Sequence, residues 1–155
     1  MKNTVVTDMK KLRKVSKPIN NINKANKIAE NLIRVTKGLG GRAVGLSAIQ
    51  IGVNRRVCVL KVGQNSWRTF INPEVIKVSD KQSGMKESCF SIPMTMQSPF
   101  FITRPKDIKV RYLDEEGNQQ VEKFKGLYSR ALQHEVDHMN GILIIDKHLK
   151  GKGGI

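Results

Sequence analysis

The sequence predicts a single α+β domain, in which antiparallel or mixed strands pack around one buried central helix, with another helix near the N-terminus. Three observations lead to this prediction. Strand-like segments occupy the middle of the chain, and they are followed by one helix with apolar or functional residues on two faces. No internal repeat and no interdomain linker divides the 155 residues. We therefore expect residues 1–155 to form one domain. Its architecture should be α+β rather than a parallel, doubly wound sheet.

The N-terminal part is expected to hold an extended arm and then a helix. The first 20 residues have no clear periodicity, and the arm is expected to end at Pro18. Apolar residues recur at helical spacing over residues 23–37, with Asn21 or Asn23 as a possible N-cap. A glycine cluster that begins at Gly38 ends this helix.

The middle of the chain contains the predicted strands. Apolar and β-branched residues, bounded by turn residues, define four strands at residues 56–62, 68–72, 74–78 and 108–113. The turn sequence DEEGN reverses the chain after the fourth, and a less regular strand leads into a helix that begins at Leu127. Gly141 is a natural stop for that helix, and the apolar run at residues 142–145 is expected to form a short strand.

Composition excludes several classes of protein. The chain is long enough to bury a core without disulfides, and its two cysteines, Cys58 and Cys89, suit a reducing compartment. No segment approaches the ~20 consecutive apolar residues of a membrane-spanning helix. The basic N-terminus lacks the apolar centre of a signal peptide. We expect a cytoplasmic protein with no membrane partner.

The charge is strongly basic. There are 28 Lys and Arg against 13 Asp and Glu, a formal net charge of +15. Such an excess indicates an anionic neighbour such as RNA or a ribosome surface. The cationic residues are nevertheless scattered, with little aromatic interleaving, so a solvated basic surface explains them equally well.

The segment QHEVDHMNG contains the pattern H-E-x-x-H, formed by His134, Glu135 and His138. A four-residue step returns to the same helix face, so both imidazoles can reach one metal ion. Glu135 is then placed to move a proton to and from a metal-bound water. The competing interpretation is two histidines satisfied inside a core, and it stays open until a third ligand is found.

The downstream sequence offers no convincing third ligand. Zinc proteases with H-E-x-x-H usually take it from a later histidine or glutamate, but Ile144 occupies the histidine position and no glutamate follows Glu135. Asp146 and His148 remain, and a histidine in the context DKHLK is more often a surface residue.

The two cysteines lie upstream in different contexts. Cys58 sits in the apolar strand RRVCVL and is best interpreted as a small core residue. Cys89 sits in KESCFSIP, where a loop can present a thiolate. Cys89 is the stronger candidate, and a Cys-His-His set with one open position is typical of a catalytic metal site.

Three blocks of the sequence together resemble the peptide deformylase family, whose members remove the formyl group from N-formylmethionine at the start of new bacterial-type proteins. AVGLSAIQ is similar to the family's G-x-G-L-A-A-x-Q block, ESCFS to E-G-C-L-S, and QHEVDH matches the helix motif. LRKVSKP and INPEV are also similar, so the resemblance covers nearly the whole chain.

The sequence departs from the family pattern without losing a ligand. In the first block, Ala43 replaces a glycine and Ser47 an alanine of the family pattern. In the second, Ser88 replaces a glycine and Phe90 a leucine. Met96 lies near a position where bacterial members often carry arginine. The chain ends soon after DKHLK, as in short members that lack a C-terminal ribosome-docking helix, some of them phage-encoded. Three glycines in LKGKGGI predict no stable helix there. The expected compartment is the cytoplasm of a bacterium, or of a host cell if the protein is virally encoded.

The resemblance implies a metal and a base. Cys89, His134 and His138 would hold one divalent ion, most often Fe(II) in this family, with Zn(II) or Ni(II) able to replace it. Glu135 would take a proton from the attacking water and pass it to the departing amine. Glu87 would be a second carboxylate or, as the family implies, a buried partner for an arginine such as Arg104.

The resemblance also implies substrate contacts. The Gln50 side-chain amide and the Phe90 backbone N–H would donate to the developing oxyanion. The peptide would run along Val44 and Gly45 by backbone hydrogen bonds, as a strand adds to a sheet edge. The methionine pocket would be formed by three residues one or two turns before His134, namely Leu127, Arg130 and Ala131.

The expected substrates are N-formylmethionyl peptides and nascent chains, and the expected protein is a monomer with a weak electrostatic ribosome contact. One alternative is an H-E-x-x-H metalloprotease that cuts internal peptide bonds, which the missing downstream ligand disfavours. Another is a non-enzymatic basic module that binds ribosomal RNA around a structural metal. Glu135 would have no purpose in that module.

Overall fold

The computed structural model describes residues 4–153 and confirms the α+β class. The helices are α1 (Met9–Leu12), α2 (Ile22–Gly38), the 3₁₀ helix η1 (Ala48–Ile51), α3 (Met94–Gln97), α4 (Gly126–Met139) and α5 (Ile144–Gly153). The strands are β1 (Gly45–Ser47), β2 (Val57–Lys61), β3 (Trp67–Val78), β4 (Gln82–Glu87), β5 (Phe100–Pro105), β6 (Asp107–Leu113) and β7 (Gln119–Lys125).

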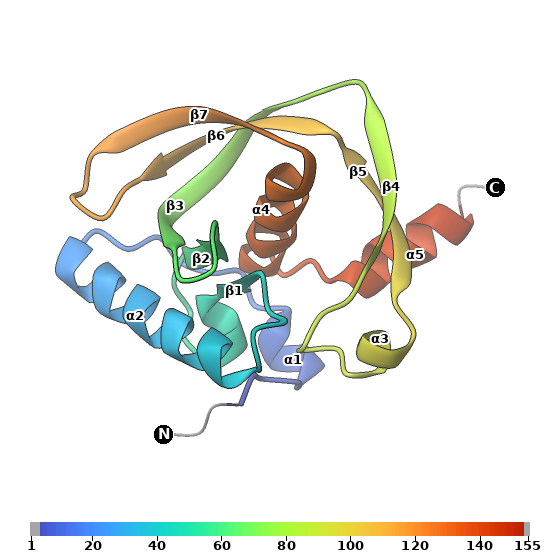
Figure 1. The fold of residues 1–155 in the computed structure, drawn as a ribbon, viewed down its shortest axis with the longest axis horizontal. Coiled ribbons are helices and arrows are strands. Elements are labelled where there is room, and N and C mark those ends of the chain that lie inside the picture. The colour runs from blue at the N-terminus through green and yellow to red at the C-terminus, as the bar shows by residue number, and fades with distance from the viewer. Residues whose placement is uncertain (1–3, 154–155) are drawn as a thin grey trace.

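The strands form two separate antiparallel sheets around α4. Five of them make a sheet in the order β1-β2-β3-β6-β7, and β4 and β5 pair with each other as a two-stranded ribbon. Helix α4 lies between the large sheet and the ribbon (Figure 1). The predicted central helix is therefore confirmed, and both sheets can bring residues to it.

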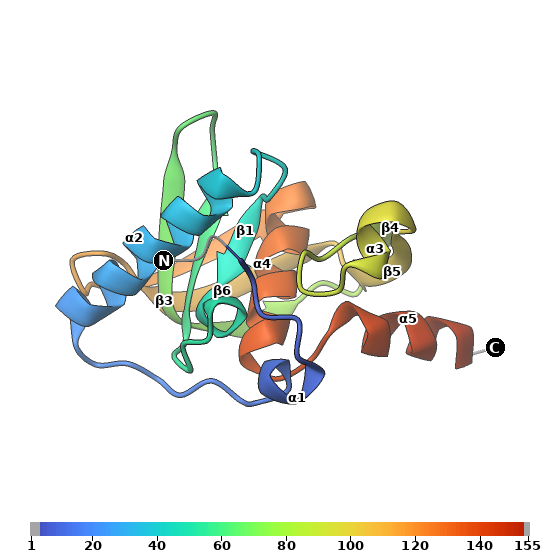
Figure 2. The same ribbon diagram turned by 90° about the horizontal axis from the view of Figure 1, so that it is seen from below.

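Strand β2 shows how the large sheet separates two cores. Val57 and Val59 pack in the cluster beneath α2, whereas Cys58 and Leu60 pack in the cluster beneath α4. Successive side chains of a strand point to opposite faces, so the two helices cover opposite faces of the sheet (Figure 2).

Helix α2 matches its prediction closely. Of the two candidate caps the structure uses Asn21, whose side chain accepts a hydrogen bond from the Lys24 backbone N–H at 2.9 Å. The helix starts one residue before the predicted range and ends one residue after it. Its buried face consists of Ala25, Ala29, Leu32, Val35 and Thr36.

Two predicted strands, at residues 68–72 and 74–78, are one continuous strand, β3. The pairing with β6 shifts register between Ile71 and Glu74, which marks a bulge. Asn72 adopts a φ of 50°, a conformation that asparagine tolerates better than most residues. Its side chain accepts from the Ile19 N–H at 2.9 Å and donates to the Ile19 carbonyl at 2.8 Å, so the bulge also fastens the N-terminal arm.

The β4–β5 ribbon was not predicted from the sequence. QSGMKE lacks the apolar alternation of a half-buried strand, and most of β4 is exposed. Polar contacts hold the ribbon to α4: Arg104 pairs with Asp137 at 2.7 Å, and the Gln133 side chain donates to the Pro105 carbonyl at 2.9 Å. Hydrophobic periodicity cannot reveal contacts of this kind.

The predicted strand at residues 142–145 and the prediction of a non-helical tail are both wrong, because α5 begins at Ile144. Leu143 and Ile144 are buried in a cluster with residues of β5. The Leu143 N–H donates to the Asp146 carboxylate at 3.0 Å, and Arg13 binds both oxygens of that carboxylate at 2.9 Å. The helix thus has a fixed start and a packed face, which override the poor helix propensity of its glycines.

The N-terminal arm is extended except for α1, and it fastens the ends of two elements. The Val6 N–H donates to the Gln50 carbonyl at 2.7 Å, and the Ser16 N–H donates to the Met139 carbonyl at 2.7 Å. Gly141 ends α4 as predicted, with a φ of 73°. Among residues 4–153, no helix combines the length and apolarity that crossing a membrane requires.

Candidate metal centre and cleft

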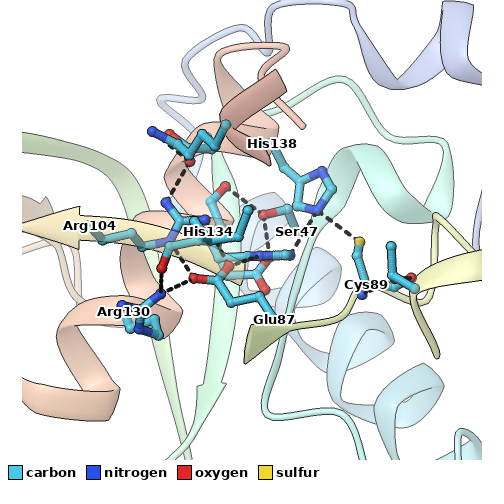
Figure 3. Close-up of polar contacts among 12 residues, drawn as sticks. Ser47, Glu87, Cys89, Arg104, Arg130, His134 and His138 are labelled. Atoms are coloured by element: carbon cyan, nitrogen blue, oxygen red, sulfur yellow. Dashed lines mark hydrogen bonds and ion pairs between the residues drawn. The ribbon is translucent and has the colours of Figure 1, made fainter. Parts of the chain in front are cut away.

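Three potential ligands meet at α4. His134 and His138 lie one turn apart, with their Nε2 atoms 3.2 Å from each other. The Cys89 Sγ, from the loop after β4, lies 3.4 Å from the His138 Nε2 (Figure 3). All three donor atoms fall within 4.8 Å of one another.

These spacings fit a metal. Tetrahedral coordination with metal–nitrogen distances of about 2.0 Å and a metal–sulfur distance of about 2.3 Å puts neighbouring donor atoms roughly 3.3–3.6 Å apart. Burial lowers the pKa of His138 well below its ordinary value, as does the nearby His134. Burial also lowers the pKa of His134, but its contacts with Cys89 and Glu87 outweigh burial and raise that pKa well above the ordinary value, so a metal would displace a proton from His134. A neutral imidazole is the form that binds a metal.

The two cysteines have different surroundings. Thr95 accepts a hydrogen bond from the Cys89 N–H at 2.8 Å, and the Ile92 N–H donates to the Cys89 carbonyl at 2.9 Å, so the loop around Cys89 is fixed. Cys58 is fully buried on β2, and that burial raises the pKa of its thiol well above the ordinary value. Cys58 is thus a core residue, as predicted. No feature of the sequence indicated the part played by Thr95.

Glu87 links the metal centre to the ribbon. Its Oε1 lies 3.2 Å from the Nδ1 of His134, an arrangement that orients a metal-binding histidine. Arg104 is the expected partner and donates to both carboxylate oxygens, at 2.6 and 2.9 Å. Burial raises the pKa of Glu87, but the hydrogen bonds with His134 and Arg104 outweigh it and hold that pKa well below the usual range.

Arg130 is a second arginine that pairs with the Glu87 carboxylate, and the sequence did not indicate this ion pair. The resemblance implied only that Arg130 forms part of the methionine pocket. In the structure the side chain is buried, and its guanidinium donates to Glu87 at 2.5 Å. It also donates to the carbonyls of Ile102 and Ser83, at 3.0 and 2.6 Å, so Arg130 lines the cleft while tying α4 to both ribbon strands.

We expect Glu87→Gln to destabilise the metal-free protein by about 3 kcal/mol at pH 7, because buried Arg130 loses its carboxylate partner and Arg104 keeps only the one on Asp137. The folded-state pKa of Glu87 is depressed, so its contribution to stability is present above the unfolded value near 4.5 and is lost as pH falls below it. Urea unfolding at pH 7 and pH 3.5 should therefore show the gap between variant and parent narrowing in acid.

Glu74→Gln is the matched control for Glu87. Glu74 pairs with Arg111 at 3.2 Å, but its side chain is 65% exposed, and exposed pairs contribute little. A Glu87 variant that is no less stable than this control at pH 7 would contradict the structural role given to Glu87.

Glu135 is buried beside the two histidines. The Ser47 hydroxyl lies 2.8 Å from its Oε2 and donates to it, a contact that an alanine at this position could not make. Burial raises the pKa of Glu135 above its ordinary value, although the charge of His134 and the bond from Ser47 oppose this. A carboxyl group with a raised pKa suits proton transfer near neutral pH.

Gly45 makes room for that carboxylate. A Cβ at this position would lie 3.1 Å from the Glu135 Oε1 and 2.7 Å from the Leu60 Cδ2. A larger residue would therefore displace the acid or the core beneath it. Close approach of these atoms is the reason for glycine at this position.

Gln50 lies inside the site rather than in a solvent-exposed loop. Its side-chain amide nitrogen is 3.7 Å from the Cys89 Sγ and 3.1 Å from the Ser91 hydroxyl. Its amide oxygen accepts from the Ser47 N–H at 3.0 Å, which fixes the direction of the amide. Its nitrogen therefore points toward the metal centre.

A cleft of about 550 Å³ opens over the centre between β1, β4 and the first turns of α4. Most of the residues proposed from the sequence line it: Val44, Gly45, Gln50, Cys89, Phe90, Leu127, Arg130, Ala131, His134 and Glu135. Val44 and Leu127 are 62% and 66% exposed, so apolar surface is available to a ligand. His138 lies deeper and is 2% exposed.

Comparison with known proteins identifies the family. Residues 1–152 match the family model described as polypeptide deformylase. The chain belongs to the peptide deformylase family. A peptide deformylase from Rhizobium meliloti is 39% identical over 140 residues, which cover 87% of this chain and 78% of that protein. One from Afipia carboxidovorans is 36% identical over 142 residues, 88% of this chain and 80% of the relative.

Solved deformylases share the fold. The crystal structure of the Thermotoga maritima peptide deformylase matches with a TM-score of 0.83 and 35% sequence identity, over 92% of this chain and 93% of that one. The chain is therefore a deformylase, a metal-dependent hydrolase that removes the N-formyl group from new polypeptides. The alternative of a metalloprotease acting on internal bonds finds no support in these matches.

Proposed function

We propose that Cys89, His134 and His138 hold the metal ion of this deformylase and that Glu135 moves the proton. One observation carries the proposal: three donor atoms within 4.8 Å of one another lie beside a buried carboxylate at the base of an open cleft. A bound divalent cation supplies a Lewis acid and a nucleophile at neutral pH.

The side chains around the cation transfer the proton, stabilise the oxyanion and orient a ligand. Glu135 accepts the proton of the attacking water and donates it to the departing amine. The Gln50 amide and the Phe90 N–H donate to the oxyanion that forms on the formyl carbonyl, and each such donor contributes roughly 3 kcal/mol. The Glu87 carboxylate keeps the His134 ring in one orientation through the 3.2 Å contact with Nδ1.

The substrate is proposed to enter as an extended peptide. Val44 and Gly45 lie at the start of β1, and among residues 4–153 β2 is the one strand that pairs with β1, so the other edge is open to a peptide. The methionine side chain packs against Leu127 and Ala131, with the buried stem of Arg130 beside them. We further propose a single-domain monomer that acts in the cytoplasm, consistent with two free cysteines.

The proposed metal is Fe(II), for which Zn(II) or Ni(II) can substitute. Protein purified without oxygen is expected to contain about one iron per chain, held at a site that includes a thiolate. Exposure to air is then expected to lower activity through oxidation of the iron and of Cys89. An air-stable protein that carries only zinc would overturn the iron assignment and leave the ligand assignment standing.

The +15 charge supports a proposed ribosome contact that is weak and electrostatic. Binding of cationic surfaces to RNA weakens steeply with salt, because each phosphate contact releases counterions. We expect co-sedimentation with ribosomes at low salt and almost none at a few hundred millimolar, while hydrolysis of a short formyl-methionyl peptide changes little. Tight binding that resists salt would show a specific docking element instead.

A further inference from the structure

The outer part of the cleft carries three cationic side chains. Arg42 precedes β1, Lys61 is the last residue of β2, and Lys86 is near the end of β4, and all three line the cleft. Arg42 and Lys86 are exposed, and Lys61 is half-buried. The cations come from three different elements that converge on one opening.

No acidic group neutralises these cations. The cleft contains two carboxylates, both at its inner end, where Glu87 is bound by arginines and Glu135 accepts from Ser47. Among the side chains of residues 4–148, none forms an ion pair or hydrogen bond with the side chains of Arg42, Lys61 and Lys86. The opening is therefore a positive region that a ligand can neutralise.

Each of the three cations is close, in sequence or in strand register, to a residue in the inner part of the cleft. Lys86 precedes Cys89 by three residues, and Arg42 precedes Gly45 by three, and three residues of chain span at most about 10 Å. Lys61 is level with Val44, whose carbonyl accepts from the Lys61 N–H at 2.8 Å. A peptide that runs outward from the metal centre covers the same distance in about three residues.

We propose that this cleft selects formylmethionyl chains with an acidic side chain at the third residue, and that Arg42, Lys61 and Lys86 determine this preference. The inference rests on the proposed placement of the peptide along β1. Charge complementarity raises the association rate and disfavours like-charged partners. The apolar pocket still selects methionine at the first residue of the peptide.

The test compares three peptides of equal length, formyl-Met-Ala-Glu-Ala, formyl-Met-Ala-Gln-Ala and formyl-Met-Ala-Lys-Ala. At low salt we expect kcat/KM to be about tenfold higher for the Glu peptide than for the Lys peptide, since each exposed charge pair contributes modestly and three cations act together. The ratio is expected to approach one near 0.5 M salt, where the screening length is only a few ångströms.

The deciding variant replaces Arg42, Lys61 and Lys86 by glutamine. We expect it to hydrolyse the Gln peptide as the parent does, within about twofold, and to lose the preference for the Glu peptide. Lys86→Glu alone is expected to reduce the ratio and favour the Lys peptide relative to the parent. Equal rates for the Glu and Lys peptides in the parent at low salt would overturn the proposal.

A charge-matched control separates the cleft from the overall basic surface. Lys24, Lys27 and Lys123 are exposed and outside the cleft, and their replacement by glutamine removes the same charge. This variant is expected to keep the tenfold preference. If the control variant lost the preference for the Glu peptide to the same extent, the preference would result from net charge, and the proposal would be contradicted. A parent protein that fails on the Gln peptide would instead refute the deformylase assignment.

Discussion

Glu135→Gln is expected to reduce kcat for a formyl-methionyl peptide by about 10²- to 10⁴-fold, the usual contribution of a general acid–base residue. Glutamine retains the shape of the side chain and can still accept from Ser47, whose hydroxyl lies 2.8 Å from the Glu135 carboxylate. The metal content and KM should therefore remain near those of the parent. Single-turnover kinetics together with metal analysis would separate the chemical step from binding.

The same variant is expected to be at least as stable as the parent at neutral pH. The pKa of Glu135 is raised in the folded protein, so ionising this buried carboxyl group costs stability as pH rises. Glutamine carries no such cost. Glu116→Gln, on the exposed turn between β6 and β7, is the control and should keep full activity. Near-normal turnover in the Glu135 variant would remove this residue from the mechanism.

Cys89→Ala is expected to abolish metal retention and with it nearly all activity, because a thiolate ligand is replaced by a methyl group. Cys58→Ala makes the same chemical change in the core, where the thiol is fully buried on β2. That variant should keep its metal and lose only about 1 kcal/mol of stability. Metal analysis and thermal unfolding of the pair provide the comparison.

The two cysteine variants also show how a wrong ligand assignment would be recognised. If the Cys58 variant lost the metal while the Cys89 variant kept it, the third ligand would have to be sought elsewhere. The proposal rests on the Cys89 Sγ, which lies 3.4 Å from the His138 Nε2.

The sequence revealed those parts of the site that depend on local spacing. His134 and His138 share a helix face because of a four-residue step, and α2 follows from its apolar period and an asparagine cap. Cys89 was proposed as the third ligand from its context and from the absence of a downstream ligand, and the structure groups it with the two histidines. These inferences needed no knowledge of long-range contacts.

The parts that the sequence did not reveal depend on contacts between distant segments. Arg130 is 43 residues from Glu87, and nothing local distinguishes it from a surface arginine. The hydroxyl of Ser47 acquires a role only because α4 brings Glu135 to it. Helix α5 forms where glycines disfavour it, because Arg13 and the β5 strand hold its first turn.

The central claim is that one cation, held by Cys89, His134 and His138, makes this chain a deformylase. Formate release from formyl-Met-Ala, followed while metal is removed by a chelator and then restored, tests it most directly. We predict that the rate falls with metal occupancy, returns on reloading to one ion per chain, and is accompanied by no cleavage of casein. Full formate release from the metal-free protein, or casein cleavage without formate release from the loaded protein, would contradict the claim.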